Sequence, residues 1–556
     1  MLESDILIEN VNSIASLHSE RLFAKLLFAQ RGAINITYGG LIERAGRYVS
    51  MYHEHGVRPE EVVVIVHNDI EQTIYAFVGA TMYGAIPSIF AHPSVKISPK
   101  EFSKTLALLL SVSRTRFLVA YRDLHDQVKG CIPADSIDLM LSEDVLAHSA
   151  APALPTANPD KIVLLQHSSG TTGLKKGVAL SNSSVINQLR NYASTLQLCQ
   201  CDRIASWLPL YHDMGLIACF LLPLATGIPL VLMSPFDWIA DPMMLFRAIH
   251  KEKCTLCWMP NFAYNFLAAR VSETDLADVD LTSMRAFINC AEPISADSHQ
   301  LFCERFRGNG VREDMLCTCY AMAENTFAVT QGGILDPVKI ETLDATAVRN
   351  RKEAIPANCR TAVCQTVISS GRAIPNNQVR IIDDCGNELP ERYIGEIAIK
   401  SDSMLNEYYN RPDLTSQGIK NGWYRSGDLG YLADGDLFVL GRIKDLIIVA
   451  GKNIYPQDIE EIVSGIEGIY PGRVVAFGIY DETIGTEEVV ILAETVVERA
   501  KHLEIKLAIA KAVREQLECV ANDILLLPHM WLIKSSSGKL SRPGNREKYL
   551  SELRAP

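Results

Sequence analysis

Short apolar runs that alternate with longer amphipathic stretches constrain the fold of this chain most. Continuous runs of this kind predict buried strands at residues 62–66, 117–120, 162–165, 228–232 and 286–288. Parallel strands need a crossover between them, usually a helix, so the alternation predicts layered α/β units with largely parallel sheets. The chain has 556 residues, too many for one compact core, so we expect two or more domains.

The pattern changes in the last third of the chain. Residues 395–440 are rich in short strands and turns and end in the hairpin-like YLADGDLFVLGR. Strand-like runs follow at 446–449, 474–479 and 489–493, and residues 500–519 predict a helix with Leu503, Leu507, Ala510 and Leu517 near one face. We therefore predict an α/β N-terminal domain of residues 1–443 with a β-rich subdomain, then a small mobile α+β domain of residues 444–556.

Composition and charge narrow the class of protein. Hydrophobic residues make up 48% and charged residues 21%, as in an ordinary soluble enzyme. The net charge of −12 argues against nucleic acid or an anionic membrane surface as a partner. The uncharged stretch 215–233 is divided by Pro223, Gly227 and Pro229, which predicts a buried helix and strand and no membrane span. No secretory signal is visible at the N-terminus, so the sequence predicts a cytoplasmic protein.

The 14 cysteines are open to two interpretations. Cys254 and Cys257 form a CxxC, and two CxC pairs occur at Cys199/Cys201 and Cys317/Cys319. A zinc site needs a second pair of ligands at a suitable spacing, and none is present. Buried, reduced thiols are therefore favoured, with a metal or redox site as the alternative.

One loop has the composition of a phosphate cradle. The segment SSGTTGLKKGV at 168–178 follows the strand-like run 162–165. Its glycines allow close approach of the backbone, its N–H groups can surround an anion, and Lys175 and Lys176 add positive charge. The spacing differs from the P-loop and from the dinucleotide fingerprint, and a flexible turn is the alternative. The residues expected to bind phosphate are Ser168, Ser169, Gly170, Thr171, Thr172, Gly173 and Lys176.

Six further segments follow the loop in a characteristic order. They read WLPLYHDMGL (207–216), NCAEP (289–293), YAMAE (320–324), YRSGDL (424–429), GRIKD (441–445) and SSSGKLSR (535–542). Together with the loop they resemble the adenylate-forming superfamily of acyl-CoA ligases, adenylation domains and luciferases over nearly the whole chain. WLPLYHDMGL, NCAEP, PNFAY, GRIKDLII, NIYPQDIE and Ala323 are most similar to fatty acyl-AMP ligases. The polar stretch 333–367 lies where that subgroup carries an insertion.

The resemblance implies a two-step reaction with ATP and Mg²⁺. A carboxylic acid, which the resemblance to that subgroup implies is a fatty acid, is joined to AMP with release of pyrophosphate. The acyl group then passes to the phosphopantetheine thiol of an acyl carrier protein. Since the attacking carboxylate is already ionised, catalysis needs positioning and charge stabilisation more than a general base. An acyl- or aryl-CoA ligase that uses free CoA is the alternative enzyme. A binding protein that takes up ATP or acyl-adenylate without catalysis is the alternative that is not an enzyme.

The resemblance also assigns residues to the nucleotide. Lys176 is the counterpart of the family's lysine, because the family usually has Pro where Lys175 stands. The adenine is expected between Tyr320, with Ala321 and Met322 beside it, and the wall Ala291, Glu292 and Pro293. Asp428 is expected to bind the ribose, Arg442 the ribose or phosphate, and Glu324 the Mg²⁺ ion. Ala321 and Cys290 stand where the family has Gly, which adds side-chain volume near the adenine.

Three residues are implied to act on the acid or on the domain motion. Lys539 is expected to contact the α-phosphate and the attacking carboxylate, and Lys444 to be the hinge about which the C-terminal domain turns between the two steps. His212 either gates the acid or is an ordinary core residue. Amino-acid adenylating enzymes have an Asp in this motif that pairs with the substrate ammonium, and His212 stands at the matching position. Because Asp213 lies one residue away, this difference argues only moderately against amino acids as substrates. The expected acyl pocket is lined by Trp207, His212, Met214, Cys257, Phe262 and Ala263.

Overall fold

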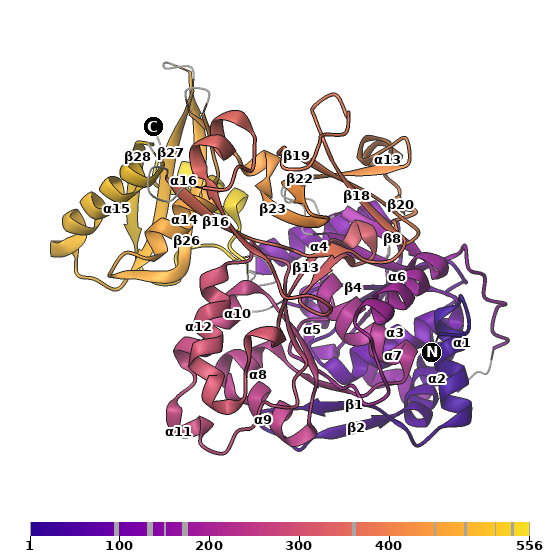
Figure 1. Cartoon of the computed structure of the whole chain (residues 1–556). Coiled ribbons are helices and arrows are strands. Elements are labelled where there is room, and N and C mark those ends of the chain that lie inside the picture. Colours follow the sequence, from indigo (N-terminus) through magenta and orange to yellow (C-terminus); the bar gives the residue numbers. More distant parts are fainter. Residues whose placement is uncertain are drawn as a thin grey trace.

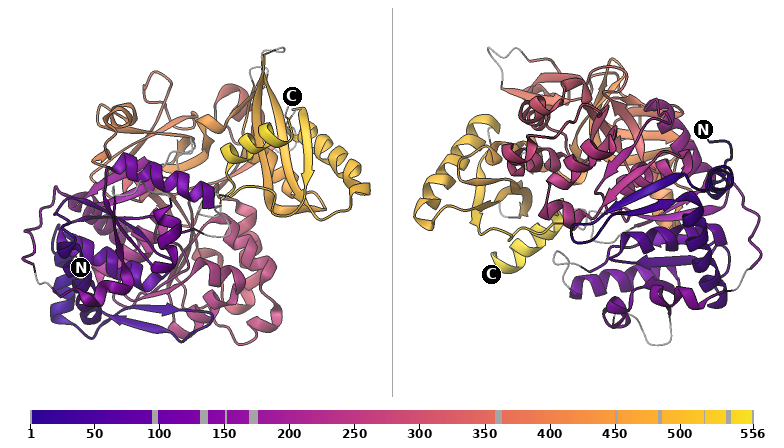
Figure 2. Two further views of the ribbon diagram at one scale, coloured as in Figure 1. Left: turned by 180° about the vertical axis from the view of Figure 1, so that it is seen from behind. Right: turned by 90° about the horizontal axis from the view of Figure 1, so that it is seen from below.

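The computed structural model shows a large N-terminal part with a smaller C-terminal unit at its side (Figure 1). It describes residues 2–93, 99–130, 137–149, 152–168, 176–357, 363–449, 452–482, 486–517, 519–534 and 539–554. The predicted α/β fold is confirmed. Figure 2 shows the same two bodies from behind and from below.

A mixed sheet forms the centre of the N-terminal part. Its strands follow the order β17-β14-β13-β12-β11-β9-β10-β1-β2, and those from β13 to β1 are parallel. They are β17 (Arg372–Ala373), β14 (Ala328–Gly332), β13 (Leu316–Ala321), β12 (Ala286–Cys290), β11 (Leu256–Met259), β9 (Ile204–Ser206), β10 (Leu230–Met233), β1 (Leu22–Leu27) and β2 (Ile34–Thr37). Every residue of β10, β11 and β12 is buried, and these strands are apolar apart from Asn289 of β12, as expected of strands covered on both faces.

Two smaller sheets complete the α/β layers. The first is fully parallel, in the order β4 (Ile86–Ile89), β3 (Val62–Val66), β5 (Phe117–Ala120) and β6 (Asp138–Leu141). The second is antiparallel, in the order β20 (Glu407–Tyr408), β8 (Lys176–Ser181) and β7 (Ile162–Ser168). The predicted strands at 62–66 and 117–120 match β3 and β5. The strand predicted at 228–232 begins only at Leu230, because Gly227 ends the preceding helix with a φ of 79°.

Helices cover these sheets on both sides (Figure 1). They are α1 (Leu7–Leu17), α2 (Tyr38–Glu54), α3 (Ile70–Tyr83), α4 (Pro99–Ser113), α5 (Arg122–Lys129), α6 (Asn182–Thr195), α7 (Leu222–Thr226), α8 (Pro235–Ala240), α9 (Met243–Glu252), α10 (Asn261–Arg270), α11 (Glu273–Leu276) and α12 (Ala296–Phe306). The apolar stretch 215–233 folds as the π-helical turn Met214–Leu221, α7 and β10. In the part of the chain that the structure describes, no helix is long and apolar enough to cross a membrane.

The β-rich subdomain lies between the large sheet and the C-terminal unit. It is antiparallel, with β18 (Asn377–Ile382), β19 (Gly395–Ser401), β22 (Trp423–Ala433), β21 (Ile419–Lys420) and β23 (Asp436–Arg442), and the short helix α13 (Pro412–Gly418). The stretch 333–367 is more regular than its polar composition suggests. It forms the two-stranded pair β15 (Ile340–Asp344) and β16 (Cys364–Ile368) with the π-helical turn Ala347–Arg351 between them.

The C-terminal unit is built on one sheet with two apolar faces. β26 (Ile469–Asp481), β27 (Thr486–Thr495) and β28 (Ala521–Leu527) form it, and β24 (Ile447–Val449) pairs with β25 (Lys452–Ile454). Because side chains alternate along a strand, Val474 and Ala476 pack with α14 (Pro456–Ser464) and α15 (His502–Leu517). Val475 and Phe477 face Tyr549 of α16 (Arg542–Glu552). The domain boundary itself stays a prediction.

The buried face predicted for the helix at 500–519 is partly wrong. Leu503 and Leu507 are 69% and 62% exposed. The residues of α15 that pack on the sheet are Ile505, Ile509, Val513 and Leu517. These four follow a spacing of four residues, so the isoleucines and Val513 define the buried stripe and the earlier leucines lie outside it.

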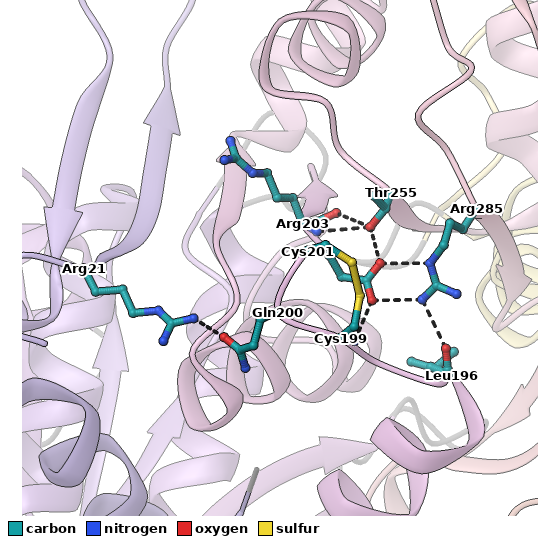
Figure 3. Close-up of a disulfide and its surroundings, with 9 residues drawn as sticks. Arg21, Leu196, Cys199, Gln200, Cys201, Arg203, Thr255 and Arg285 are labelled. Atoms are coloured by element: carbon teal, nitrogen blue, oxygen red, sulfur yellow. Dashed lines mark hydrogen bonds and ion pairs between the residues drawn. A yellow bond between two sulfur atoms is a disulfide. The ribbon is translucent and has the colours of Figure 1, made fainter. Parts of the chain in front are cut away.

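The expectation of reduced thiols is wrong for one CxC pair. Cys199 and Cys201 form a disulfide in the loop between α6 and β9, where their Cα atoms lie 5.3 Å apart (Figure 3). The loop turns back on itself at Gln200, which brings the two side chains to the same side. Cys254, Cys257, Cys317 and Cys319 are free and buried, and no cluster of metal ligands occurs among the described residues.

We predict that this disulfide contributes less to stability than the neighbouring Asp202. The bond closes a loop of only three residues, so its loss lowers the free energy of unfolding by no more than about 2 kcal/mol. Asp202 is fully buried and accepts hydrogen bonds from Arg285, from the Thr255 hydroxyl and from the Cys199 backbone N–H, at 2.7–2.9 Å (Figure 3). Asp202→Ala removes the acceptor of all these hydrogen bonds, leaves the donors without it, and lowers the free energy of unfolding by about 3 kcal/mol.

Denaturant unfolding of the wild type, of Asp202→Ala and of Cys199→Ser with Cys201→Ser checks this order of effects. The wild type is also measured with a reductant, which controls for the serine hydroxyls. A larger loss of stability in the cysteine variant than in Asp202→Ala would contradict the prediction.

Candidate active site

Residues 169–175 of the predicted phosphate loop lie outside the described residues. Ser169, Gly170, Thr171, Thr172, Gly173 and Lys175 are among them. The ends of the loop are described: Ser168 closes β7, Lys176 opens β8, and the two are paired across the ladder. The loop therefore joins two adjacent antiparallel strands.

Lys176 lies in a cluster that also contains Glu324. Its ammonium is 4.6 Å from the centre of the Tyr408 ring. The Tyr408 hydroxyl donates a 2.7 Å hydrogen bond to Glu324 Oε1 and lies 3.0 Å from the Tyr424 hydroxyl. Burial lowers the pKa of Lys176, Glu324 opposes this shift, and the charges of Lys444 and Arg411 add to it. The cluster thus holds one cation and one carboxylate at the base of the loop.

The Glu324 carboxylate is compatible with a Mg²⁺ ion shared with phosphate. Mg²⁺ keeps several waters and is usually held by one or two carboxylates together with substrate phosphates. Glu324 is 8% exposed in the turn Ala323–Asn325, and Tyr408 fixes one of its oxygens. No group of three potential metal ligands occurs in the described ranges, so a metal at this position would depend on its substrate for further ligands.

Tyr320, Asp428 and Arg442 form a second cluster. The Tyr320 hydroxyl donates to Asp428 Oδ2 at 2.6 Å, and Arg442 Nε lies 3.4 Å from Asp428 Oδ1. Asp428 and Arg442 are direct partners in the β22–β23 ladder, so the register of this hairpin brings the charges together. Burial raises the pKa of Asp428, and the charge of Arg442 and the hydrogen bond from Tyr320 oppose this.

The two positions where the family has Gly face different surroundings. Cys290 is fully buried and is paired with Cys319 across β12 and β13, so its added volume lies in the core. Ala321 ends β13 and is only half-buried, as is the neighbouring Met322. Ala291, Glu292 and Pro293 follow directly after β12, and Ala291 adopts a left-handed φ of 73°. β12 therefore ends within the NCAEP segment, after Cys290.

His212 and Asp213 form an ion pair at the start of the π-helical turn. His212 Nδ1 lies 2.6 Å from Asp213 Oδ1, and Asp213 accepts a 2.8 Å hydrogen bond from the Met214 N–H. The bend is tight, because a Cβ at Gly215 would collide with the carbonyl oxygen of Pro209. The sequence did not assign Asp213 a role. Its neighbour His212 is half-buried.

The charge of Lys539 reaches this same ion pair from the C-terminal unit. Burial alone would raise the pKa of Asp213, but the charges of His212 and Lys539 hold it below its usual range. The hydrogen bond with Cys319 and burial raise the pKa of Cys290, the last residue of β12, and the charge of Lys539 opposes this rise. The Lys534 ammonium of the C-terminal unit lies 5.6 Å from the centre of the Phe262 ring, so this unit lies against the N-terminal part, and the charge of Lys539 acts on Asp213 across the junction.

An aromatic cluster lies beside the ion pair. Trp207 stacks on Trp238 with a centroid distance of 3.8 Å, and Phe262 meets both rings edge-on. The Phe262 N–H donates a 3.0 Å hydrogen bond to Glu292, which connects this cluster to the NCAEP segment. Of the other predicted pocket residues, Met214 is buried at the start of the π-helical turn, and Cys257 and Ala263 are fully buried. Trp238 comes from α8, outside every motif in the sequence.

Lys444 lies between the N-terminal part and the C-terminal unit. It is exposed in the turn Ile443–Asp445, which follows β23 and precedes β24. Its charge acts on Lys176. The position is compatible with a hinge, and the hinge stays a prediction.

The segment 333–367 contacts the C-terminal unit through a polar cluster. The Gln365 side chain donates a 2.9 Å hydrogen bond to Asp458 of α14, and Arg349 lies 3.9 Å from the same carboxylate. Leu343, Val348 and Val367 pack in one apolar cluster with Tyr455, which precedes α14. The segment thus bridges the β-rich subdomain and the C-terminal unit.

We predict that this contact weakens as the pH rises. Burial raises the pKa of Asp458 to about 7, while Arg349 opposes the shift and Glu461 adds to it. A carboxyl group whose pKa is higher in the folded than in the unfolded state stabilises the fold fully below its unfolded pKa of about 4 and loses that contribution as the pH rises through 7. Asp458→Asn is therefore expected to raise the melting temperature at pH 8 and to leave it unchanged at pH 4.

Melting curves from pH 4 to 9 for the wild type, Asp458→Asn and the exposed-site control Asp402→Asn test this expectation. Equal melting temperatures of wild type and Asp458→Asn at pH 8 would contradict it.

This chain matches one family model and is similar to known proteins in sequence and in structure. The family model for AMP-binding enzymes matches residues 20–409. A Caulobacter vibrioides protein named as an acyl-CoA synthetase is 29% identical over 89% of this chain and 87% of its own length. JamA of Moorena producens, a medium-chain-fatty-acid–acyl-carrier-protein ligase, is 28% identical over 96% of this chain and 93% of its own. A solved structure from work on fatty acyl-adenylate ligases of E. coli and L. pneumophila has 27% identity and a TM-score of 0.90, and covers 99% of this chain and 98% of that one.

Proposed function

This chain belongs to the AMP-binding enzyme family, and from that membership we propose that it activates a fatty acid as its acyl-adenylate and passes the acyl group to an acyl carrier protein. It is an adenylate-forming ligase that uses ATP. The identity of the acid, the acceptor and the roles of single residues are the parts that we propose.

In the first step a carboxylate oxygen of the acid attacks the α-phosphorus of ATP. The new P–O bond forms the acyl-adenylate, and the bond to the bridging oxygen breaks as pyrophosphate leaves. Lys176 binds the β- and γ-phosphates with the loop before it, and Lys539 stabilises the charge that develops at the α-phosphate. Tyr320 stacks on the adenine opposite Ala291, and Asp428 accepts hydrogen bonds from the ribose.

One observation carries this proposal. The charge of Lys539, which is 17 residues from the end of the chain, acts on Asp213 of the N-terminal part. A lysine that must contact both the acid and the α-phosphate has to lie at the junction between the two parts in the state that forms the adenylate. The electrostatic effect of Lys539 on Asp213, which acts across this junction, supports that arrangement.

We propose that Glu324 holds a Mg²⁺ ion together with the phosphates. When bound, the ion neutralises phosphate charge in the transition state. Tyr408 holds the Glu324 carboxylate through its hydroxyl and lies under the Lys176 ammonium with its ring, so one side chain positions both the carboxylate and the cation.

In the second step a thiol sulfur attacks the acyl carbon, a thioester forms and AMP leaves. We propose that the thiol belongs to the phosphopantetheine of a carrier protein. Similarity to JamA over nearly the whole chain supports this acceptor, and the contacts that the described part of segment 333–367 makes with the C-terminal unit support it further. Similarity to a protein named as an acyl-CoA synthetase keeps free CoA as the second candidate.

Mass spectrometry of the purified protein with ATP, Mg²⁺ and a panel of short, medium, long and aromatic acids tests the proposal. Each acid is incubated alone, with CoA and with a holo carrier protein. Acyl-AMP that accumulates and moves only to the carrier supports the proposed function. Rapid conversion to acyl-CoA would overturn the acceptor, and ATP binding without adenylate from any acid would favour a non-catalytic binder.

A further inference from the structure

The two ends of the loop that carries Lys539 are tied together inside the C-terminal unit. The Ser541 N–H donates to the Ile533 carbonyl at 3.0 Å. Asn545, which is fully buried in α16, accepts from the Ile533 N–H at 2.8 Å and donates to the carbonyls of Ile533 and Ser541. The base of the loop is therefore fixed, and Lys539 follows the motion of that base.

Arg542 connects this base to two carboxylates. It follows Ser541, and its Nη2 donates to both oxygens of Glu460 at 2.8 and 3.0 Å. Its Nη1 donates to Asp445, and its Nε donates to the Ala476 carbonyl at 2.9 Å. Glu460 in turn accepts from the Ala476 N–H at 2.9 Å. The guanidinium is thus engaged on all three of its nitrogens.

The position of Asp445 connects this network to the predicted hinge. Asp445 comes directly after Lys444, the predicted hinge, and Arg542 comes three residues after Lys539. All partners of Arg542 follow Lys444 in the chain, so the network moves as one piece when the unit turns. The side chains of Arg542 and Asp445 are 17% and 14% exposed, and a pair this well shielded from water holds its geometry.

We propose that Arg542 is a positioning residue for the adenylation step. It fixes the Lys539 loop to the residue beside the hinge, so that the angle adopted at Lys444 determines where the Lys539 ammonium lies relative to Asp213. Lysine cannot replace it, because an ammonium on a flexible stem does not reach three partners in fixed directions. This inference rests on the proposed role of Lys539.

The test separates the two half-reactions. Formation of acyl-AMP is measured from acid and ATP, and transfer is measured from pre-formed acyl-AMP to a thiol acceptor, a step that does not need Lys539 beside the α-phosphate. We expect Arg542→Lys and Asp445→Asn to slow formation by about 10- to 100-fold, since misplacement of a catalytic group by about 1 Å can cost that much. Transfer is expected to stay within about 3-fold of wild type. Arg546→Lys, an exposed position on the same helix, serves as the control.

A double-variant comparison and a labelling measurement make the outcome decisive. Combined with Lys539→Ala, Arg542→Lys should slow formation no further than Lys539→Ala alone, because both act through one group. The Lys539 amine should also react faster with an amine-specific reagent in Arg542→Lys and Asp445→Asn than in wild type, with Lys511 as the reference. The labelling measurement needs no turnover. It therefore tests the role of Arg542 even if the wild type forms no adenylate and the proposed function is wrong.

Equal losses in both half-reactions would overturn the proposal, because they indicate a role in folding alone. Additive losses in the double variant, or unchanged labelling of Lys539 in both single variants, would overturn it as well.

Discussion

Lys539→Ala is expected to slow acyl-AMP formation by about 100- to 1000-fold, the loss typical of removing one group that stabilises developing charge. The lysine is the contribution of the C-terminal unit to a site otherwise built by the N-terminal part, and its charge already acts on Asp213. The binding of ATP should change little, because Lys176, Tyr320 and Asp428 remain. Formation is measured as acyl-AMP by mass spectrometry, and ATP binding by calorimetry.

The matched control is Lys511→Ala, an exposed lysine of α15. Transfer from pre-formed acyl-AMP gives a second control, since the second step is expected to proceed after Lys539 has withdrawn. If Lys539→Ala weakened ATP binding as much as it slowed formation, the residue would be a general phosphate ligand and its proposed role would be wrong.

The sequence predicts the individual elements of this site well. The strand predicted at 162–165, before the loop at 168–178, lies within β7, and the GDL and GRIKD motifs lie opposite each other as Asp428 and Arg442. The strand is a local feature, because an apolar run indicates it directly. Residues that lie on one hairpin are brought together by its register, which a sequence pattern can indicate.

Partners that come from distant elements could not be predicted in this way. Tyr408 meets Glu324 and Lys176 only because β20 pairs with β8. Trp238 stacks on Trp207 from α8, and the two are 31 residues apart in sequence, with no spacing rule between them. Likewise the disulfide at Cys199 depends on the path of a loop, and the buried face of α15 depends on which stripe the sheet contacts.

Glu324→Gln is expected to slow acyl-AMP formation by about 100-fold or more and to raise the Mg²⁺ concentration needed for half of the maximal rate. Glutamine keeps the size of the side chain and an oxygen that can accept from Tyr408, so the change removes mainly the negative charge. Mg²⁺ prefers anionic oxygen ligands, and the described residues offer this site no further cluster of metal ligands that could compensate. Rates measured across a Mg²⁺ titration, at fixed ATP, check the prediction.

Tyr408→Phe is the control that separates the charge of Glu324 from its environment. It removes the hydroxyl that bonds to Glu324 and keeps the ring beside Lys176. A hydrogen bond to a charged group contributes about 1.5–3 kcal/mol net, so this variant should lose about 10- to 100-fold in rate but should keep the Mg²⁺ dependence of the wild type. If both variants shifted the Mg²⁺ dependence equally, the hydrogen-bonded pair would be the functional unit. If neither variant shifted the Mg²⁺ dependence, the metal would bind elsewhere, because a carboxylate that holds Mg²⁺ cannot lose its charge without weakening the binding of the ion.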